Sequence, residues 1–140
     1  MAHQRVPPTY RVPTAATLLA VSDDTVRRWI AAGRLSAGED DQGRMVVEGA
    51  ELARFAREQV ADDHPDRPAS VTSARNRLPG IVTDVRRDAV MAQVEIQAGP
   101  HRIVSLISSD AVAELGLEPG VLVAASVKAT NVVVERMDEP

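Results

Sequence analysis

The stretch SDDTVRRWIAAG, residues 22–33, decides the fold of the first half of the chain. Ser22 is a good N-cap residue, and the two acids after it lie in the first turn, where the helix dipole favours negative charge. Apolar residues recur at helical spacing on one face from Val26 to Ile30, and Gly33 ends the pattern. The stretch therefore predicts a helix whose apolar face packs inward and whose arginines point outward.

The segments on either side of this helix complete a small domain. Residues 14–19 predict a short first helix, and residues 50–60 predict a last one. Between them, residues 38–47 predict a small β-hairpin with Asp41-Gln42-Gly43 near its tip. Two helices joined by a tight turn and followed by a hairpin predict a helix-turn-helix with a wing.

The outward face of the second helix carries side chains suited to DNA. Arginine can grip a guanine edge or a phosphate, and threonine can meet a phosphate or a thymine methyl group. Trp29, in contrast, is predicted to lie in the core. The residues predicted to contact double-stranded DNA are Ser22, Thr25, Arg27, Arg28 and, on the wing, Arg44.

The apolar pattern changes to a period of two in the second half, which predicts strands. The pattern predicts an α+β protein of two domains: a mainly α winged helix-turn-helix at residues 1–60 and a five-stranded OB-like β-barrel with one short helix at residues 72–137. A linker rich in proline and charge is predicted at residues 61–71. The expected strands are 78–85, 89–96, 101–107, 121–127 and 132–136, and the short helix is 109–115, capped by Ser108 or Ser109.

Two short polar motifs bracket this second domain. Ser73-Ala74-Arg75-Asn76 precedes its first strand, and Lys128-Ala129-Thr130 lies between its last two. Lys128 is the only lysine of the chain. Because the first and last strands of a small barrel lie close together, we expect the two motifs to meet. Hydroxyls, amides, main-chain N–H groups and two cations are the donors that a compact oxyanion requires.

Composition excludes several classes of function. The chain has no cysteine, and its three histidines lack spaced partners, so neither a disulfide framework nor a metal site is predicted. There is no nucleophile–base arrangement or phosphate loop, which argues against an enzyme. No apolar run is long enough to span a membrane and no signal peptide is recognisable, so a cytoplasmic protein is expected. The net charge of −4 falls entirely in residues 61–140.

Residues 10–16 and 25–35 resemble the winged helix-turn-helix of MerR-type regulators and phage excisionases. The resemblance covers about residues 8–60 and implies DNA binding. The wing departs from the family, since Glu39-Asp40-Asp41 make it acidic where members usually carry basic residues.

Residues 73–80, 105–117 and 127–132 resemble the molybdate-binding domain of the molbindins, the Mop-type TOBE domain. The resemblance implies an OB-like barrel, a homo-oligomer formed through it, and molybdate or tungstate held between subunits, with one wall from a neighbouring subunit's Ser108 and Ala111. Ala111 and Ala129 stand where members often carry serine. The oxyanion-binding residues implied are Ser73, Ala74, Arg75, Asn76, Ser108, Ala111, Lys128, Ala129 and Thr130.

Two functions remain open at this point. The first is a transcription regulator that binds DNA through its first domain and molybdate, tungstate or another oxyanion through its second. The alternative is an intracellular molybdate store or carrier whose first half is a docking or assembly module. The acidic wing and the neutral charge of residues 1–60 motivate that alternative.

Overall fold

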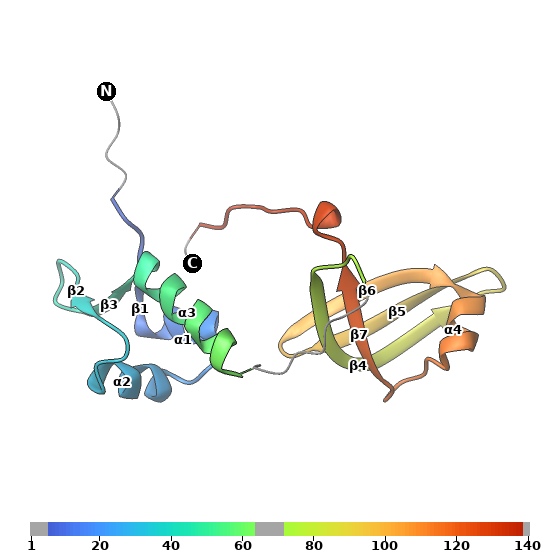
Figure 1. Ribbon diagram of the computed structural model, residues 1–140, viewed down its shortest axis with the longest axis horizontal. Coiled ribbons are helices and arrows are strands. Elements are labelled where there is room, and N and C mark those ends of the chain that lie inside the picture. Colours follow the sequence, from blue (N-terminus) through green and yellow to red (C-terminus); the bar gives the residue numbers. More distant parts are fainter. Residues whose placement is uncertain (1–5, 64–71, 139–140) are drawn as a thin grey trace, which may run out of the picture. The chain divides into compact units, whose positions relative to one another are not determined.

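A computed structural model describes residues 6–63 and 72–138, with side chains up to residue 59 in the first range. The chain divides into two compact units, Met1–Ala69 and Ser70–Pro140 (Figure 1). The predicted linker began at residue 61, whereas the last helix of the first unit continues to Asp63. The rest of that linker lies outside the described residues.

The first unit places three helices around a small antiparallel sheet. Its elements are β1 (Thr9–Arg11), α1 (Val12–Leu19), α2 (Asp23–Ala31), β2 (Gly38–Glu39), β3 (Met45–Glu48) and α3 (Gly49–Asp63). The sheet order is β1-β3-β2. The three helices and the hairpin were expected from the sequence, whereas β1 was not. Its three residues pair with β3, and a segment this short carries no periodic signal.

One apolar cluster holds the first unit together. Val26 of α2, Leu35, Val47 of β3 and Phe55 of α3 are all fully buried in it. Trp29 packs against Phe55 with 4.8 Å between ring centroids, which confirms that it belongs to the core. These long-range contacts fix α2 against α3 and the hairpin.

The second unit is a strongly bent antiparallel sheet with one helix. Its elements are β4 (Asn76–Arg87), β5 (Met91–Ala98), β6 (His101–Ser108), α4 (Ser109–Leu115), β7 (Leu122–Val127) and the 3-10 turn η1 (Ala129–Asn131). The strand order is β6-β5-β4-β7. The register of β4 against β5 shifts between Val82 and Asp84. Such a bulge bends a strand, so the first half of β4 pairs with β7 and the second half with β5.

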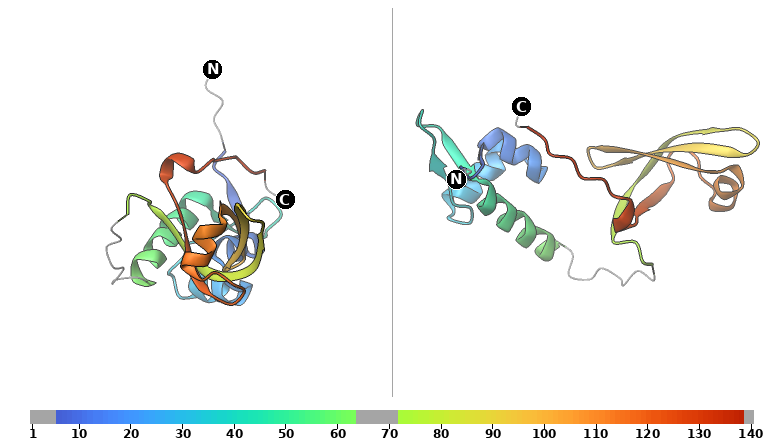
Figure 2. Two further views of the ribbon diagram at one scale, coloured as in Figure 1. Left: turned by 90° about the vertical axis from the view of Figure 1, so that its right-hand side faces the viewer. Right: turned by 90° about the horizontal axis from the view of Figure 1, so that it is seen from above.

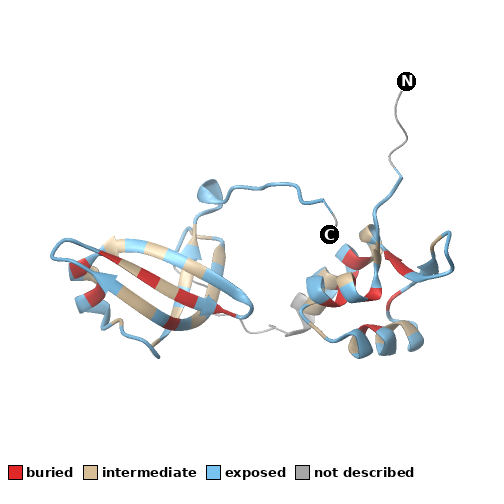
Figure 3. Ribbon diagram, turned by 180° about the vertical axis from the view of Figure 1, so that it is seen from behind, coloured by how far each residue is buried: buried red, intermediate tan, exposed pale blue. Residues whose placement is uncertain are grey.

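The expectation of five strands in this unit is wrong for the single chain. Residues 132–138 form no strand, and Val133 and Val134 are 91% and 89% exposed. The colours of Figure 3 show the exposure of this segment. A strand needs a neighbour for its backbone groups, and within the described ranges 6–63 and 72–138 none pairs with these residues. Four strands therefore form the sheet.

No helix among the described residues is long and apolar enough to cross a membrane.

Candidate functional site

The N-terminus of α2 is organised by Ser22, the residue that the sequence predicted as its cap. The Ser22 hydroxyl accepts a hydrogen bond from the Thr25 main-chain N–H at 3.2 Å. The two hydroxyl oxygens of Ser22 and Thr25 are 2.9 Å apart, and Arg28 Nη2 donates to Thr25 Oγ1 at 3.2 Å. Three of the predicted DNA-contacting side chains thus form one chain of hydrogen bonds.

Exposure separates the two faces of α2. Val26 is fully buried, whereas Arg27 and Arg28 are exposed. Ser22, Asp24, Arg27, Arg28 and Ala31 line one open hollow on the outer face of the helix. Both arginines therefore border this hollow, on the side of α2 that the core does not use.

The fifth predicted DNA contact, Arg44, lies on the wing and is already paired. Its Nε donates to Asp40 Oδ2 at 2.9 Å. Asp40 Oδ1 also accepts the main-chain N–H groups of Gln42 and Arg44, both at 2.9 Å. These hydrogen bonds, led by the one from the Arg44 backbone, hold the pKa of Asp40 below its usual value. The acidic wing thus keeps Arg44 partly neutralised, while 45% of its side chain stays exposed.

The second unit brings together the two polar motifs that bracket it in sequence. β4 and β7 are antiparallel, and Asn76 pairs with Val127. Residues 73–75, which run into β4, therefore lie beside Lys128, which leaves β7. The Asn76 side-chain amide donates to Val127 O at 3.1 Å and ties the two ends together. Ser73, Arg75 and Lys128 are exposed at this end of the sheet.

Local hydrogen bonds shape both motifs. Residues Lys128–Asn131 make a 3-10 turn in which Asn131 N–H donates to Lys128 O at 2.9 Å. The N–H groups of Ala129 and Thr130 precede this first bonded donor, and such leading N–H groups have no partner within their own turn. Both residues follow Lys128 directly in the chain. The turn thus offers two main-chain donors next to an ammonium.

Thr72 is a positioning residue that our sequence reasoning missed. Its hydroxyl accepts the N–H of Ala74 at 3.2 Å, and its carbonyl accepts Arg75 Nη1 at 3.4 Å. A threonine hydroxyl that bonds the backbone two residues later is a recognised turn signal. That signal was present in the sequence one residue before the motif that we selected.

Ser108 and Ala111 lie far from the other predicted oxyanion residues within one chain. Ser108 pairs with Met91 at the start of β5, beside the Arg87 end of β4. Arg87 Nη2 donates to Ser109 O there, at 3.5 Å. The Asn76 end of β4 lies eleven residues earlier along the same strand. A single chain therefore does not bring all nine predicted residues to one place.

Ser108 is the cap of α4, and this settles the alternative between Ser108 and Ser109. Its hydroxyl oxygen accepts the Ala111 N–H at 3.1 Å, so this main-chain donor is already used. The Ser108 O–H proton itself remains available to a ligand. Ser109 is buried instead, with its hydroxyl bonded to the carbonyl of Asp88.

These features define a two-part protein, a helix-turn-helix unit followed by a small OB-like unit. A model of the TOBE domain matches residues 72–134, and a helix-turn-helix domain model matches residues 9–60. Neither description names an enzymatic activity. Molybdenum-pterin-binding protein 2 of Clostridium pasteurianum is 43% identical over 63 residues, which are 44% of this chain and 93% of that protein. The chain therefore belongs to the TOBE-domain family of the molybdenum-pterin-binding proteins, with a helix-turn-helix domain ahead of it.

Two solved structures are also similar to the second unit. MopII from Clostridium pasteurianum is 41% identical and covers 46% of this chain and 98% of its own, with a TM-score of 0.44. A molybdate-binding protein from Sporomusa ovata is 36% identical and covers 48% of this chain and all of its own, with a TM-score of 0.46.

Proposed function

We propose that this protein is a molybdate- or tungstate-responsive DNA-binding regulator of transcription. The observation that carries the proposal is the junction of β4 and β7, where residues 73–76 and 128–130 meet, in a chain that also has a helix-turn-helix domain. Membership in the molybdenum-pterin-binding family supports molybdate as the oxyanion. The protein then acts through binding at both units and carries out no catalysis.

The donors at this junction match the charge of the proposed ligand. Molybdate is a tetrahedral dianion, and Arg75 and Lys128 supply one positive charge each. The N–H groups of the turn and the hydroxyls of Ser73 and Thr130 add further hydrogen-bond donors. Together with the two cations they are enough to bond all four oxygens of the anion. Because Ala129 has no hydroxyl, this set relies on main-chain N–H groups at that position.

A second copy of the chain completes the proposed site. Ser108 and Ala111 lie at the opposite end of β4 from Lys128, so they reach the anion only from a neighbouring copy. This arrangement makes the protein a homo-oligomer through its second unit. It also suits DNA recognition, since a symmetric pair of helix-turn-helix units reads two half-sites. Two copies that share an anion can adopt more than one arrangement. The anion changes DNA affinity only to the extent that it binds one of these arrangements more tightly than another.

The anion site is tested by calorimetric titration of the full chain with molybdate, tungstate and sulfate. We expect Lys128→Ala to abolish molybdate binding, because it removes one of the two cations. Arg102→Ala is the matched control, since Arg102 is an exposed cation of the same unit that pairs with Glu95. Molybdate affinity that is unchanged in Lys128→Ala would place the site elsewhere.

DNA binding is tested by gel shift on the DNA upstream of the protein's own gene, with and without molybdate. We expect affinity to fall steeply as salt rises, with a slope of about −0.9 per phosphate contacted. The double variant Arg27→Ala/Arg28→Ala should weaken binding and leave molybdate affinity intact. Arg57→Ala removes an exposed arginine from α3 and serves as the control.

A second function, a molybdate store or carrier, is favoured by one observation on the wing. Asp40 pairs with Arg44 and lowers the positive charge that the wing offers to DNA. Under this function the first unit docks or assembles the protein. Absence of a gel shift at low salt, both with and without molybdate, would support it and remove the regulator.

A further inference from the structure

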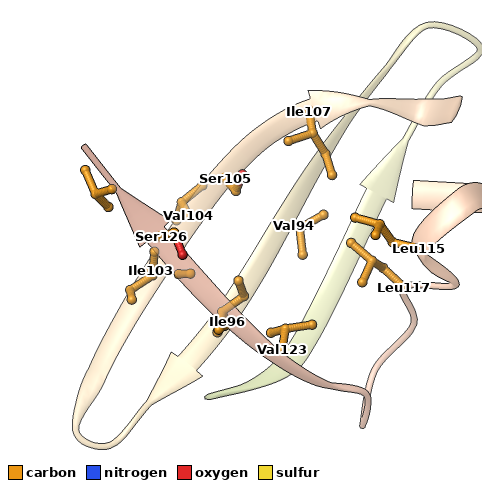
Figure 4. A pocket seen from close by; sticks show the side chains of 13 residues that line it. Val94, Ile96, Ile103, Val104, Ser105, Ile107, Leu115, Leu117, Val123 and Ser126 are labelled. Carbon is orange, nitrogen blue, oxygen red and sulfur yellow. The ribbon is translucent and has the colours of Figure 1, made fainter. Parts of the chain in front are cut away.

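Two hollows in the described parts of the chain differ in the chemistry of their walls. The apolar groove of the second unit has a volume of about 280 Å³, and all of its lining residues are apolar or carry a hydroxyl. Figure 4 shows aliphatic side chains such as Ile103, Ile107 and Val123 around it. The hollow on the outer face of α2 is lined instead by two arginines, one acid, a serine and an alanine. The charged side chains of this second hollow can recognise a polar partner.

The α2 hollow follows one face of the helix. Asp24, Arg27, Arg28 and Ala31 are spaced at i, i+3, i+4 and i+7, so they lie on the same side of α2. Ala31 adds only a methyl group, and all four residues are exposed. The surface therefore lies open and suits the edge of a large partner.

The carboxylate of Asp24 is the one acidic group among the five residues of this hollow. Its spacing of four residues from Arg28 suits an ion pair, yet Arg28 Nη2 donates to Thr25 Oγ1 at 3.2 Å instead. Within the described ranges, the acids that form ion pairs are Asp40, Glu51, Glu58, Asp84 and Glu95. Asp24 therefore keeps its carboxylate oxygens available to accept from a partner.

The wing shows a carboxylate with a different use. The β2–β3 hairpin projects from the first unit (Figure 2), and Asp40 accepts a hydrogen bond from Arg44 Nε there. Asp40 also closes the turn by accepting the main-chain N–H groups of Gln42 and Arg44. Its role is thus structural, whereas no turn of the described chain depends on Asp24 in this way.

Stabilisation of the helix does not by itself account for Asp24. The helix dipole favours an acid in the first turn, and Asp23 already supplies one. Both acids are exposed, but Asp24 borders the two arginines and Asp23 is not among the residues that line the hollow. The two neighbours therefore separate an effect on the helix from an effect on its outer face.

A carboxylate beside two guanidinium groups changes what the face can bind. Phosphate contacts hold a protein on DNA without regard to sequence, and a negative charge repels every phosphate alike. A base edge that donates a hydrogen bond compensates for this repulsion. Cytosine N4 is such a donor in the major groove, whereas adenine N6 lies next to the acceptor N7. A carboxylate thus favours one base and disfavours the others, which is a source of specificity.

We propose that Asp24 is a specificity-determining residue that accepts a hydrogen bond from the N4 amino group of a cytosine in the major groove. This inference rests on the proposed function, because it requires α2 to lie in that groove. Arg27 and Arg28 then bind guanine or phosphate beside it. Asp24 lowers affinity for DNA in general and restores it only where a cytosine meets the helix.

Selection of binding sites from a pool of randomised duplexes tests the proposal, with the full chain and in the presence and absence of molybdate. We expect the wild type to select a cytosine at one fixed position. Asp24→Asn should shift the preference at that position towards adenine, because asparagine bonds adenine N6 and N7 together. The ratio of affinities for the wild-type site and for mixed-sequence DNA should fall about tenfold.

Asp23→Asn is the matched control, since it removes the same charge from the same turn. It should raise affinity for the wild-type site and for mixed-sequence DNA by a similar factor, so that their ratio stays unchanged. Circular dichroism and molybdate calorimetry check that both variants keep their fold and their anion affinity.

Several outcomes would overturn the role of Asp24. Equal ratios in the two variants would show that it acts through charge alone. A cytosine preference that persists in Asp24→Asn, or a wild-type selection without a fixed cytosine, would also reject the contact and leave the proposed function intact. Failure of the proposed function looks different, because then neither the wild type nor Asp23→Asn would bind any duplex at low salt, and both proposals would fall.

Discussion

The two units of this protein complete their folds to different degrees. The first unit buries eight residues in one cluster and closes it with a Trp29–Phe55 contact. The second unit has five residues in its main cluster and leaves an apolar groove open. Among the described residues, three large apolar side chains are exposed in the first unit and eleven in the second. The second unit therefore leaves more of its apolar side chains in contact with solvent than the first.

This contrast shows how a short chain divides its functions. The unit with a closed core can present Arg27 and Arg28 on its own, because its packing needs nothing further. The open unit has a sheet of four strands with an apolar groove, and under the proposed function it needs a second copy to complete its anion site. The following changes test the comparison, from the largest expected effect to the smallest.

Phe55→Ala should affect only the closed unit. Phe55 is 2% exposed and contacts Trp29 and the Arg34 guanidinium. Removing a buried ring costs about 3–5 kcal/mol, so the free energy of unfolding of the first unit should fall by that amount. Denaturation followed by Trp29 fluorescence measures this, and molybdate affinity provides the comparison. Loss of molybdate binding in this variant would mean that the units do not fold independently.

Gly80→Ala should affect only the open unit. A Cβ at this position would lie 2.5 Å from Gln97 O and 2.9 Å from Ile96 Cγ2, where β4 crosses β5. Overpacking of this kind costs about 1–3 kcal/mol. Gly38→Ala is the control, because a Cβ there meets nothing within 4 Å. Equal melting temperatures for the two variants would contradict the close approach of β4 and β5 at this position.

Two serine caps provide a matched pair of smaller changes. Ser22 caps α2 and Ser108 caps α4, each through its hydroxyl, and replacement of either with alanine costs about 1 kcal/mol. Gel shifts and calorimetry should separate them. Ser22→Ala should weaken DNA binding alone, and Ser108→Ala should weaken molybdate binding alone. A reversed or shared effect would reject the assignment of one function to each unit.

Glu51→Gln should have the smallest effect, and the effect should depend on pH. Hydrogen bonds from Arg54 and from the Ser36 N–H lower the pKa of Glu51 to about 2. A lowered carboxyl pKa contributes stability above the ordinary value of about 4.3, and this stability is lost as pH falls through the folded value. Melting curves of the two proteins should therefore differ at pH 7 and converge towards pH 2. A difference that does not change with pH would assign the effect to packing.

Local patterns predicted most of the first unit and the strands of the second. Ser22 and Ser108 act as caps where the sequence placed them, because capping depends on residues within one turn. The two polar motifs meet because β4 and β7 pair, as expected from barrel topology. The strand predicted at residues 132–136 is wrong for the single chain, because these residues pair with no described strand. The apolar pattern alone could not say whether this segment has a partner.

The sequence by itself determined where helices begin, which faces are apolar and which short motifs carry donors, because these properties follow from neighbours along the chain. Tertiary structure alone decided that Ser108 and Ala111 lie at the far end of β4 from Lys128, and that the sheet has four strands and an apolar groove. Pairing of strands joins residues far apart in sequence, and whether an edge finds a partner depends on the geometry of the intervening turns. In this protein the residues that follow the Lys128–Asn131 turn pair with no described strand.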